Sequence, residues 1–263
     1  MTTLADFFEA RWRDDDQPAS WHIGALPAMW ASLQRAGVDA QGCSLTVGPA
    51  SGPNDVAAYV TSIANGAVPA ELADSWREVG PFRATFGALT ARWLSPREIL
   101  AEREPLRARI GRSVRKAHPE MDVLALVNDK PALLFDPTQT AVPRGEKVWY
   151  HMADGEPYAV LGWIIAIRFT LELKRHLEDL VPDVHLARLD EPLPTDRAHV
   201  RLHKDDRYWE GLRYGARLMT RTGKPRALGK KPTKVTLLEL DNAAAASARL
   251  EKLAAAARKK GFG

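Results

Sequence analysis

Two histidines flank an arginine in the sequence HVRLH, and this short pattern is the best candidate for chemistry in the chain. In an extended strand, His199, Arg201 and His203 would share one face, with the two apolar residues on the other. Two imidazoles beside a guanidinium could bind a phosphate group, and one imidazole could act as a general base near neutral pH. One interpretation is therefore a metal-independent endoribonuclease. A polar face exposed to solvent explains the same pattern without catalysis.

The second feature is a stretch of 28 residues, Gly211–Leu238, that contains no Asp or Glu; we call it the acid-free stretch. Its eight basic residues are Arg213, Arg217, Arg221, Lys224, Arg226, Lys230, Lys231 and Lys234. If its first part is helical, the three arginines form one stripe, whose mutual repulsion an anionic ligand would relieve. The same part also fits a strand, and the segment that follows Gly223 is expected to be a loop. Such a concentration of positive charge predicts a polyanion as partner, with nucleic acid as the leading choice.

Three aromatic residues, Tyr208, Trp209 and Tyr214, lie close to this charge. Aromatic rings can stack on unpaired bases, each contact contributing about 1–3 kcal/mol. Packing in the core is the alternative for the same rings. Stacking would favour RNA or a single strand over a duplex by a small margin. No modular DNA-reading motif is present, which favours recognition of backbone and shape.

Charge is distributed unevenly along the chain. Residues 1–80 hold four basic and ten acidic side chains (net −6), residues 81–196 hold sixteen and seventeen (net −1), and residues 197–263 hold seventeen and six (net +11). We therefore expect an acidic helical region over 1–94, a central region over 95–196 and a basic C-terminal region over 197–263, with one continuous domain as the alternative. The polarised charge predicts a binding face at the C-terminal end. The acidic end could bind a protein neighbour.

A second basic surface is expected on the helix that follows Ser95. Ser95, Pro96 and Glu98 form the pattern of a capping box with proline at the first helical position. Pro105 is expected to bend the helix or divide it in two. The later part of this segment has no acidic residue, and its cations are Arg109, Arg112, Arg115 and Lys116.

The remaining pattern indicates an α+β fold, with a mostly helical N-terminal part and a mixed, hairpin-containing C-terminal part. Short helices are expected over the first eighty residues. Two apolar runs around Asn128 and Asp129 predict a hairpin, because these residues tolerate the positive φ of a tight turn. A long helix is expected over Tyr158–Leu180. The strand VTLLEL should precede a final alanine-rich helix capped by Asp241 or Asn242.

Composition excludes several classes of protein. Hydrophobic residues make up 45% of the chain and there are eight Trp, which indicates a folded core. The single cysteine, Cys43, permits neither an intrachain disulfide nor a cysteine-based metal cluster. No HExxH, phosphate-loop, dinucleotide-binding or GxSxG motif is present, so no metal and no cofactor is predicted. No secretory signal and no apolar run long enough for a bilayer is seen, which predicts a cytoplasmic protein without a membrane partner.

These observations together predict a nucleic-acid-binding protein that contacts the phosphate backbone through a basic C-terminal surface. Such a chain could be a subunit of a larger ribonucleoprotein or defence complex. The first alternative is the endoribonuclease based on His199, Arg201 and His203. The second is a non-catalytic assembly protein whose basic surface binds an acidic protein surface.

Overall fold

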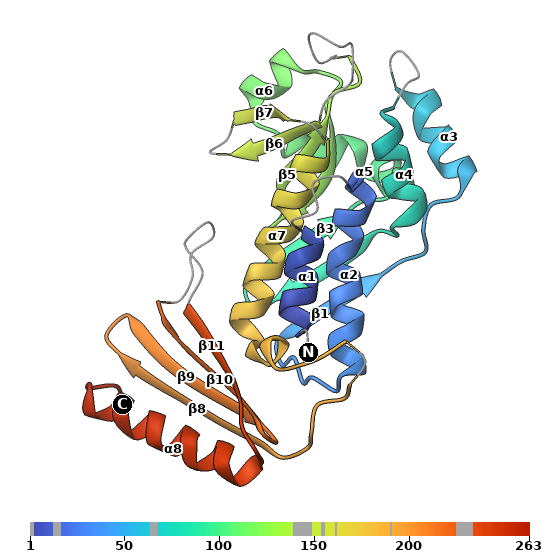
Figure 1. Ribbon diagram of the computed structural model, residues 1–263. Helices are drawn as coiled ribbons and strands as arrows, with labels where there is room; N and C mark the ends of the chain where they lie inside the picture. Colours follow the sequence, from blue (N-terminus) through green and yellow to red (C-terminus); the bar gives the residue numbers. More distant parts are fainter. Residues whose placement is uncertain are drawn as a thin grey trace. The chain divides into compact units, whose positions relative to one another are not determined.

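The computed structural model describes residues 3–12, 17–63, 68–138, 149–153, 156–160, 162–189, 191–224 and 234–263. The chain divides into two compact units, each of which combines helices with an antiparallel sheet (Figure 1). The first-sheet unit comprises Arg11–Ala28 and Gly42–Leu173; the second-sheet unit comprises Met1–Ala10, Met29–Gln41 and Lys174–Gly263. The boundary falls inside three helices, α1 (Leu4–Trp12), α2 (Ala19–Arg35) and α7 (Gly162–Leu180). The α+β prediction is confirmed, whereas the three successive regions, which were defined by charge, stay a prediction.

The first-sheet unit is built on a sheet whose strands, among the described residues, follow one another in chain order and are all antiparallel. The strands are β1 (Cys43–Val47), β2 (Phe82–Phe86), β3 (Leu89–Trp93), β4 (Asp122–Val127), β5 (Lys130–Phe135), β6 (Trp149–Ala153) and β7 (Glu156–Val160). Buried and exposed residues alternate strictly along β2, the pattern of a sheet with one buried face. The predicted β4–β5 hairpin is confirmed, with φ of 49° at Asn128 and 60° at Asp129.

Helices α3 (Pro53–Ser62), α4 (Ala70–Glu78), α5 (Pro96–Ala108) and α6 (Arg112–Ala117) belong to the same unit. The predicted capping box starts α5: Glu98 N donates to Ser95 Oγ at 3.2 Å, and Ser95 N donates to Glu98 Oε2 at 3.0 Å. Pro105 lies inside α5, and the chain continues as α6 after a short break. Buried Asp122 on β4 accepts hydrogen bonds from Tyr59, Arg103 and Arg107, so it links α3 and α5 to the sheet.

The second-sheet unit contains the part of α1 (Leu4–Trp12) that ends at Ala10, and a short 3₁₀ helix, η2 (Pro182–His185). Its sheet is antiparallel, with the strand order β11-β10-β9-β8. The strands are β8 (Arg197–Lys204), β9 (Arg207–Tyr214), β10 (Arg217–Gly223) and β11 (Lys234–Glu239), followed by α8 (Ala243–Lys259). As predicted, Asn242 caps α8, its Oδ1 accepting from Ala245 N at 2.9 Å.

Helix α8 lies along one face of this sheet (Figure 1). Leu250 packs there with Leu202, Trp209 and Leu218 in a common apolar cluster. The approach is close at Gly211, where an added Cβ would lie 2.5 Å from Leu250 Cδ1 and 2.8 Å from the Trp209 ring. Because only glycine leaves that space free, Gly211 allows α8 to pack on the middle of β9. The opposite face of the sheet carries His199 and Arg201 of β8, Glu210 of β9 and Arg221 of β10.

Two expectations about secondary structure are wrong, and the choice between helix and strand for Gly211–Arg221 is decided in favour of strand. The first eighty residues are not purely helical, because Cys43–Val47 forms the edge strand β1. Helix α7 begins at Gly162 rather than Tyr158, since Glu156–Val160 pairs with β6. A helical acid-free stretch is excluded over Gly211–Arg221, where β9 and β10 form a hairpin that turns at Gly215 with a φ of 53°.

Candidate functional site

The three arginines expected to form a ligand-binding stripe are instead buried and paired within the second-sheet unit. Arg213, Arg217 and Arg221 have exposed fractions between 2% and 8%. Arg213 donates two hydrogen bonds of 2.6 Å to the Asp196 carboxylate. Arg217 pairs with Glu191 and donates to the backbone oxygen of Leu186 at 3.2 Å. Each of these guanidinium groups is thus buried and paired with an acid of the protein, and none is presented to a ligand.

Arg221 makes the most extensive of these contacts. Its Nε pairs with Glu210, and both side chains are only 1% exposed. Its two terminal nitrogens donate to the backbone oxygens of Glu178 at 2.8 Å and Asp179 at 2.7 Å, in the last turn of α7. Carbonyl groups at a helix C-terminus lack partners within the helix and carry partial negative charge. Arg221 therefore acts as a cap for α7 and as the counter-ion of Glu210.

The three aromatic residues predicted to lie beside the basic residues are also buried. Of the two interpretations, base stacking and core packing, the structure therefore favours core packing. Trp209 belongs to the apolar cluster under α8. The guanidinium groups of Arg201 and Arg221 lie 4.7 and 5.6 Å from the centroid of the Tyr208 ring. Tyr214 donates its hydroxyl hydrogen to Asp183. Burial first, and then the hydrogen bond to Asp183 and its negative charge, raise the pKa of Tyr214 well above its ordinary value.

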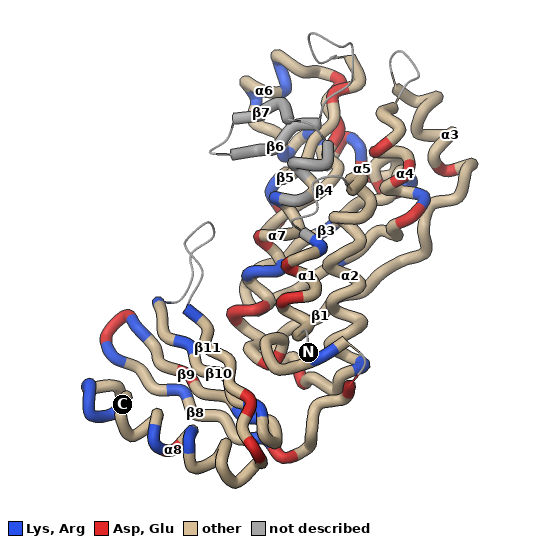
Figure 2. Tube along the Cα trace, in the orientation of Figure 1, with Lys and Arg blue, Asp and Glu red and all other residues tan. Residues whose placement is uncertain are grey.

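The other predicted cations have different positions. Lys224 and Lys234 are exposed at the ends of β10 and β11, and Lys224 pairs with Asp206. Arg226, Lys230 and Lys231 lie outside the described residues. In the first-sheet unit, Arg109 donates to Asp129 at 3.1 Å, while the exposed cations of α6 are Arg112, Arg115 and Lys116. Figure 2 shows, in blue, the Lys and Arg positions along the strands of the second-sheet unit and at the C-terminal end of α8.

The structure brings two residues of the HVRLH strand together with one acid that sequence reasoning missed. His199 and Arg201 share a face of β8, as predicted, and Glu210 lies on the neighbouring strand β9. The His199 Nε2 atom lies 2.9 Å from Glu210 Oε1, and Arg201 Nη1 lies 3.8 Å from the same oxygen. Burial alone raises the pKa of Glu210, but the hydrogen bond from His199 and the charge of Arg221 outweigh it and leave the pKa below its ordinary value. Glu210 is therefore an anion that orients His199.

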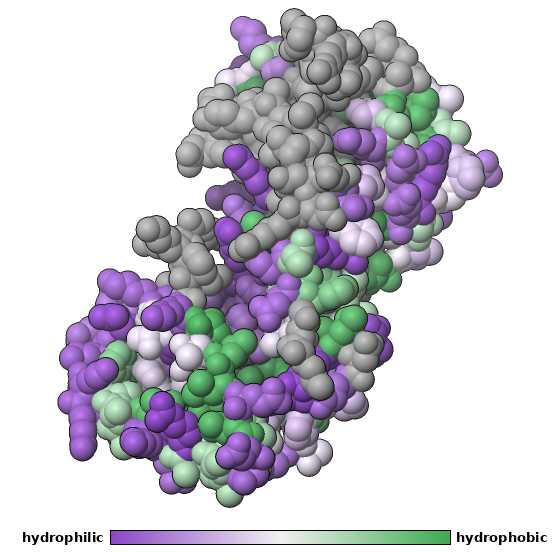
Figure 3. All heavy atoms as spheres, viewed as in Figure 1, coloured by the Kyte–Doolittle hydropathy of each residue, from purple (hydrophilic) through white to green (hydrophobic). Residues whose placement is uncertain are grey.

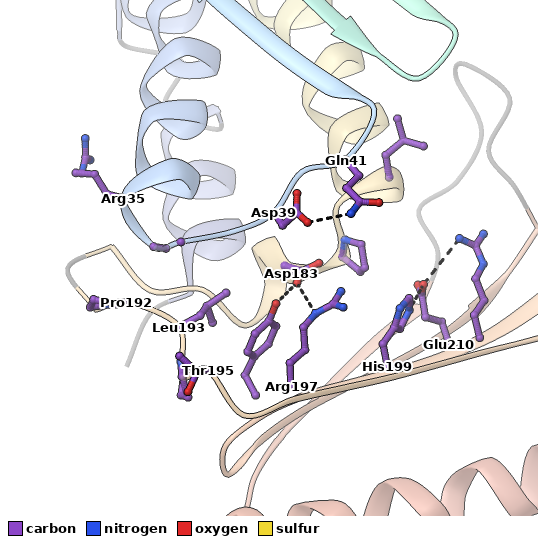
Figure 4. A pocket seen from close by; sticks show the side chains of 17 residues that line it. Arg35, Asp39, Gln41, Asp183, Pro192, Leu193, Thr195, Arg197, His199 and Glu210 are labelled. Atoms are coloured by element: carbon purple, nitrogen blue, oxygen red, sulfur yellow. Dashed lines mark hydrogen bonds and ion pairs between the residues drawn. The ribbon is translucent and has the colours of Figure 1, made fainter.

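These side chains line a pocket of about 660 Å³ (Figure 4). Arg197, His199 and Arg201 project into it from β8, with side chains 43%, 32% and 39% exposed. Arg197 pairs with buried Asp183 at 3.4 Å and lies over the Tyr214 ring, so its position is fixed from two sides. The other lining residues are Arg35, Ala36, Gly37, Asp39, Gln41, Leu180, Pro182, Asp183, Pro192, Leu193, Pro194, Thr195, Glu210 and Tyr214.

His203 shares the face of β8 but is not part of the pocket lining. Its backbone forms two hydrogen bonds of 2.8 Å with Gly263, so the C-terminal residue pairs with this end of the edge strand. Of the three residues proposed for catalysis from sequence, the structure thus brings together His199 and Arg201 with Glu210, and leaves His203 apart.

The register of the β8–β9 hairpin explains how Glu210 could have been found. The hairpin turns at Asp205 and Asp206, and Asp205 has a φ of 52°. A turn at this Asp-Asp pair places Arg201 directly opposite Glu210. Recognition of that turn in the sequence would therefore have identified the carboxylate, because antiparallel pairing fixes cross-strand neighbours.

The described part of the chain contains no group of three or more His, Cys, Asp or Glu side chains arranged to hold a metal ion. Nor does any described helix have the length and apolar character needed to cross a membrane. The fold and site thus define an α+β protein with a charged pocket beside an edge strand. Comparison with protein-family models, curated proteins and solved structures finds no match.

Proposed function

We propose that this protein binds nucleic acid through the phosphate backbone, with Arg197, His199 and Arg201 as the central contact; we call these three residues the β8 row. The observation that carries the proposal is the placement of the row. Alternate residues of a strand share a face and lie about 6.6 Å apart, so the row presents two fixed cations and an imidazole in a line. All three side chains are partly exposed and open into one pocket.

Further positive charge is carried by described, exposed residues of the same unit. These cations are Lys204, Arg207, Lys224, Lys234, Arg249, Lys252, Arg258, Lys259 and Lys260. In the space-filling view, the lower left edge, over the β8–β9 turn and the end of α8, is mostly hydrophilic (Figure 3). Cations distributed in this way favour contact with a chain of phosphates over recognition of base edges.

The sequence-based preference for RNA or a single strand rested on stacking by Tyr208, Trp209 and Tyr214. Because all three rings are buried, that preference loses its support and the backbone becomes the main determinant. A cytoplasmic location and a role as a complex subunit, with a protein partner at the acidic end, stay parts of the proposal.

The test is the salt dependence of binding to fluorescein-labelled RNA, single-stranded DNA and duplex DNA, measured by fluorescence anisotropy. Replacing Arg197 and Arg201 together by Gln leaves two phosphates without a cationic partner. For each such phosphate, the slope of log K against log salt should become shallower by about 0.7 with a single strand and about 0.9 with duplex DNA. The reason is that fewer counter-ions are then released on binding.

The matched control replaces two exposed arginines of the first-sheet unit, Arg77 and Arg83, by Gln and removes the same net charge. Its salt slope should equal that of the unmodified protein. The proposal fails if no nucleic acid binds at low salt, or if the two double variants weaken binding equally.

A further inference from the structure

The pocket also holds the elements of a catalytic site, and we propose that it cleaves RNA by transesterification, with His199 as the general base. This inference rests on the proposed function, because the backbone must first bind along the β8 row. It goes further in naming the substrate class, since the reaction requires a ribose 2′-hydroxyl.

The base is defined by the hydrogen bond between His199 and Glu210. An ionised carboxylate only accepts hydrogen bonds, so the 2.9 Å contact places the His199 ring hydrogen on Nε2. In the neutral imidazole, Nδ1 then carries the lone pair that can accept a proton. The ring is 32% exposed at the pocket. A buried carboxylate that fixes the ring and its tautomer is the arrangement found in catalytic triads.

Glu210 is itself held in place from the opposite side. Its Oε2 atom pairs with buried Arg221, while Oε1 contacts His199 and lies 3.8 Å from Arg201. Because both oxygens have partners, the carboxylate has little freedom to rotate away from the imidazole. Glu210 is therefore a positioning residue that acts through His199.

Arg201 supplies the cation that the reaction needs. Its guanidinium lies 4.7 Å from the centroid of the Tyr208 ring, which holds it beside His199 on the same face of β8. Charge builds up on the non-bridging phosphate oxygens as the nucleophile adds to phosphorus. A fixed guanidinium stabilises that charge, and Arg197, on the other side of His199, can bind the neighbouring phosphate.

The proposed reaction conserves atoms, electrons and protons. His199 Nδ1 takes the proton of the 2′-hydroxyl, the O2′–P bond forms and the P–O5′ bond breaks, which leaves a 2′,3′-cyclic phosphate. The 5′-oxygen departs with the electron pair of that bond and takes a proton from a water molecule in the open pocket. The resulting hydroxide takes the proton from the His199 imidazolium, so water and the neutral base are regenerated. DNA lacks the 2′-hydroxyl and cannot react in this way.

The experiment uses the full chain with two labelled strands: an oligoribonucleotide, and the same sequence with 2′-O-methyl groups, which can bind but cannot react. Binding of the methylated strand is measured by anisotropy, and cleavage of the ribose strand by gel and by mass spectrometry of the cyclic phosphate end. His199→Ala should lower the cleavage rate by about 10²–10⁴-fold, the usual contribution of a general base. Added imidazole should restore part of that rate, which a merely structural role would not allow.

Two further variants complete the design. His203→Ala is the matched control, because His203 lies on the same face of β8 but outside the pocket, and it should leave cleavage unchanged. Glu210→Gln should lower kcat with little change in KM, as expected for a residue that positions the base. Preparations of all variants are purified identically, so cleavage by a contaminating nuclease would appear equally in each.

The outcomes separate the two proposals. Absence of binding to the methylated strand overturns the proposed function, and this inference with it. Binding without cleavage of the ribose strand overturns the inference alone, as does cleavage that survives His199→Ala at the original rate. Loss of cleavage in His199→Ala, with rescue by imidazole and with the methylated strand still bound through Arg197 and Arg201, supports both.

Discussion

Replacing Arg221 by Met should destabilise the second-sheet unit more than any exposed substitution. The change removes the counter-ion of a carboxylate that is 1% exposed, together with the cap on the last turn of α7. Loss of one partner from a buried ion pair costs about 3–5 kcal/mol, because the remaining charge stays in the protein interior. We expect the free energy of unfolding to fall by about that amount. Urea unfolding followed by hydrogen exchange in β9 and β10 measures it.

A double variant separates the ion pair from the packing of the methylene groups. Replacing both Arg221 and Glu210 by Met removes the two charges together. The loss of unfolding free energy in the double variant should then be smaller than the sum of the losses in the two single variants. The difference should be about 0.5–3 kcal/mol, the usual coupling between residues in contact. If Arg221→Met costs less than about 1 kcal/mol, or the two single costs simply add, the reasoning that Arg221 is a structural counter-ion is refuted.

Three further predictions concern stability. Because the pKa of Glu210 is lowered in the folded protein, its carboxylate stabilises the fold at pH values above its ordinary pKa of about 4.3, and this stabilisation is lost as the pH falls below that value. The free energy of unfolding, measured as a function of pH, should show this loss, and Glu210→Gln should make that dependence on pH flatter. Asp122→Ala removes the buried carboxylate that the Tyr59 hydroxyl and two partly buried arginines, Arg103 and Arg107, share. It should cost about 1–3 kcal/mol in urea, because the buried hydroxyl is left without that partner; a cost typical of surface sites would contradict this. Gly80→Ala places a Cβ 1.9 Å from the Gly48 carbonyl oxygen and should lower the free energy of unfolding by at least about 1–3 kcal/mol, measured by thermal unfolding. Gly111→Ala is the control, because a Cβ there meets open space and should cost far less. Equal effects of the two substitutions would refute the argument.

Local signals in the sequence predicted local structure correctly. The capping box at Ser95 and Glu98 and the turn at Asn128 and Asp129 each depend on residues within a few positions. Helix caps and tight turns are formed by neighbours in the chain, so a sequence contains all of their determinants. The cap at Asn242 belongs to the same class.

The site depends on contacts that no local pattern contains. Strand β9 is buried along nearly its whole length, because α8 covers one face while the segment that includes Asp183 and Leu186 covers the other. Such a strand has no period-two alternation, so Gly211–Arg221 could not be assigned to helix or strand. Glu210 gave no signal on its own, since its importance comes from cross-strand pairing with Arg201.

The acid-free stretch shows why a local count of charge does not define a binding surface. Its buried arginines find their acids outside the stretch, on Asp196, Glu191 and Glu210, and a meander of strands brings these groups together. Among the described residues, the cations that line the pocket include the β8 row, which lies upstream of the stretch. Arg221 still affects that row, because it holds the carboxylate that orients His199. A side chain that appears in the sequence as a ligand contact thus acts on the site from within the core.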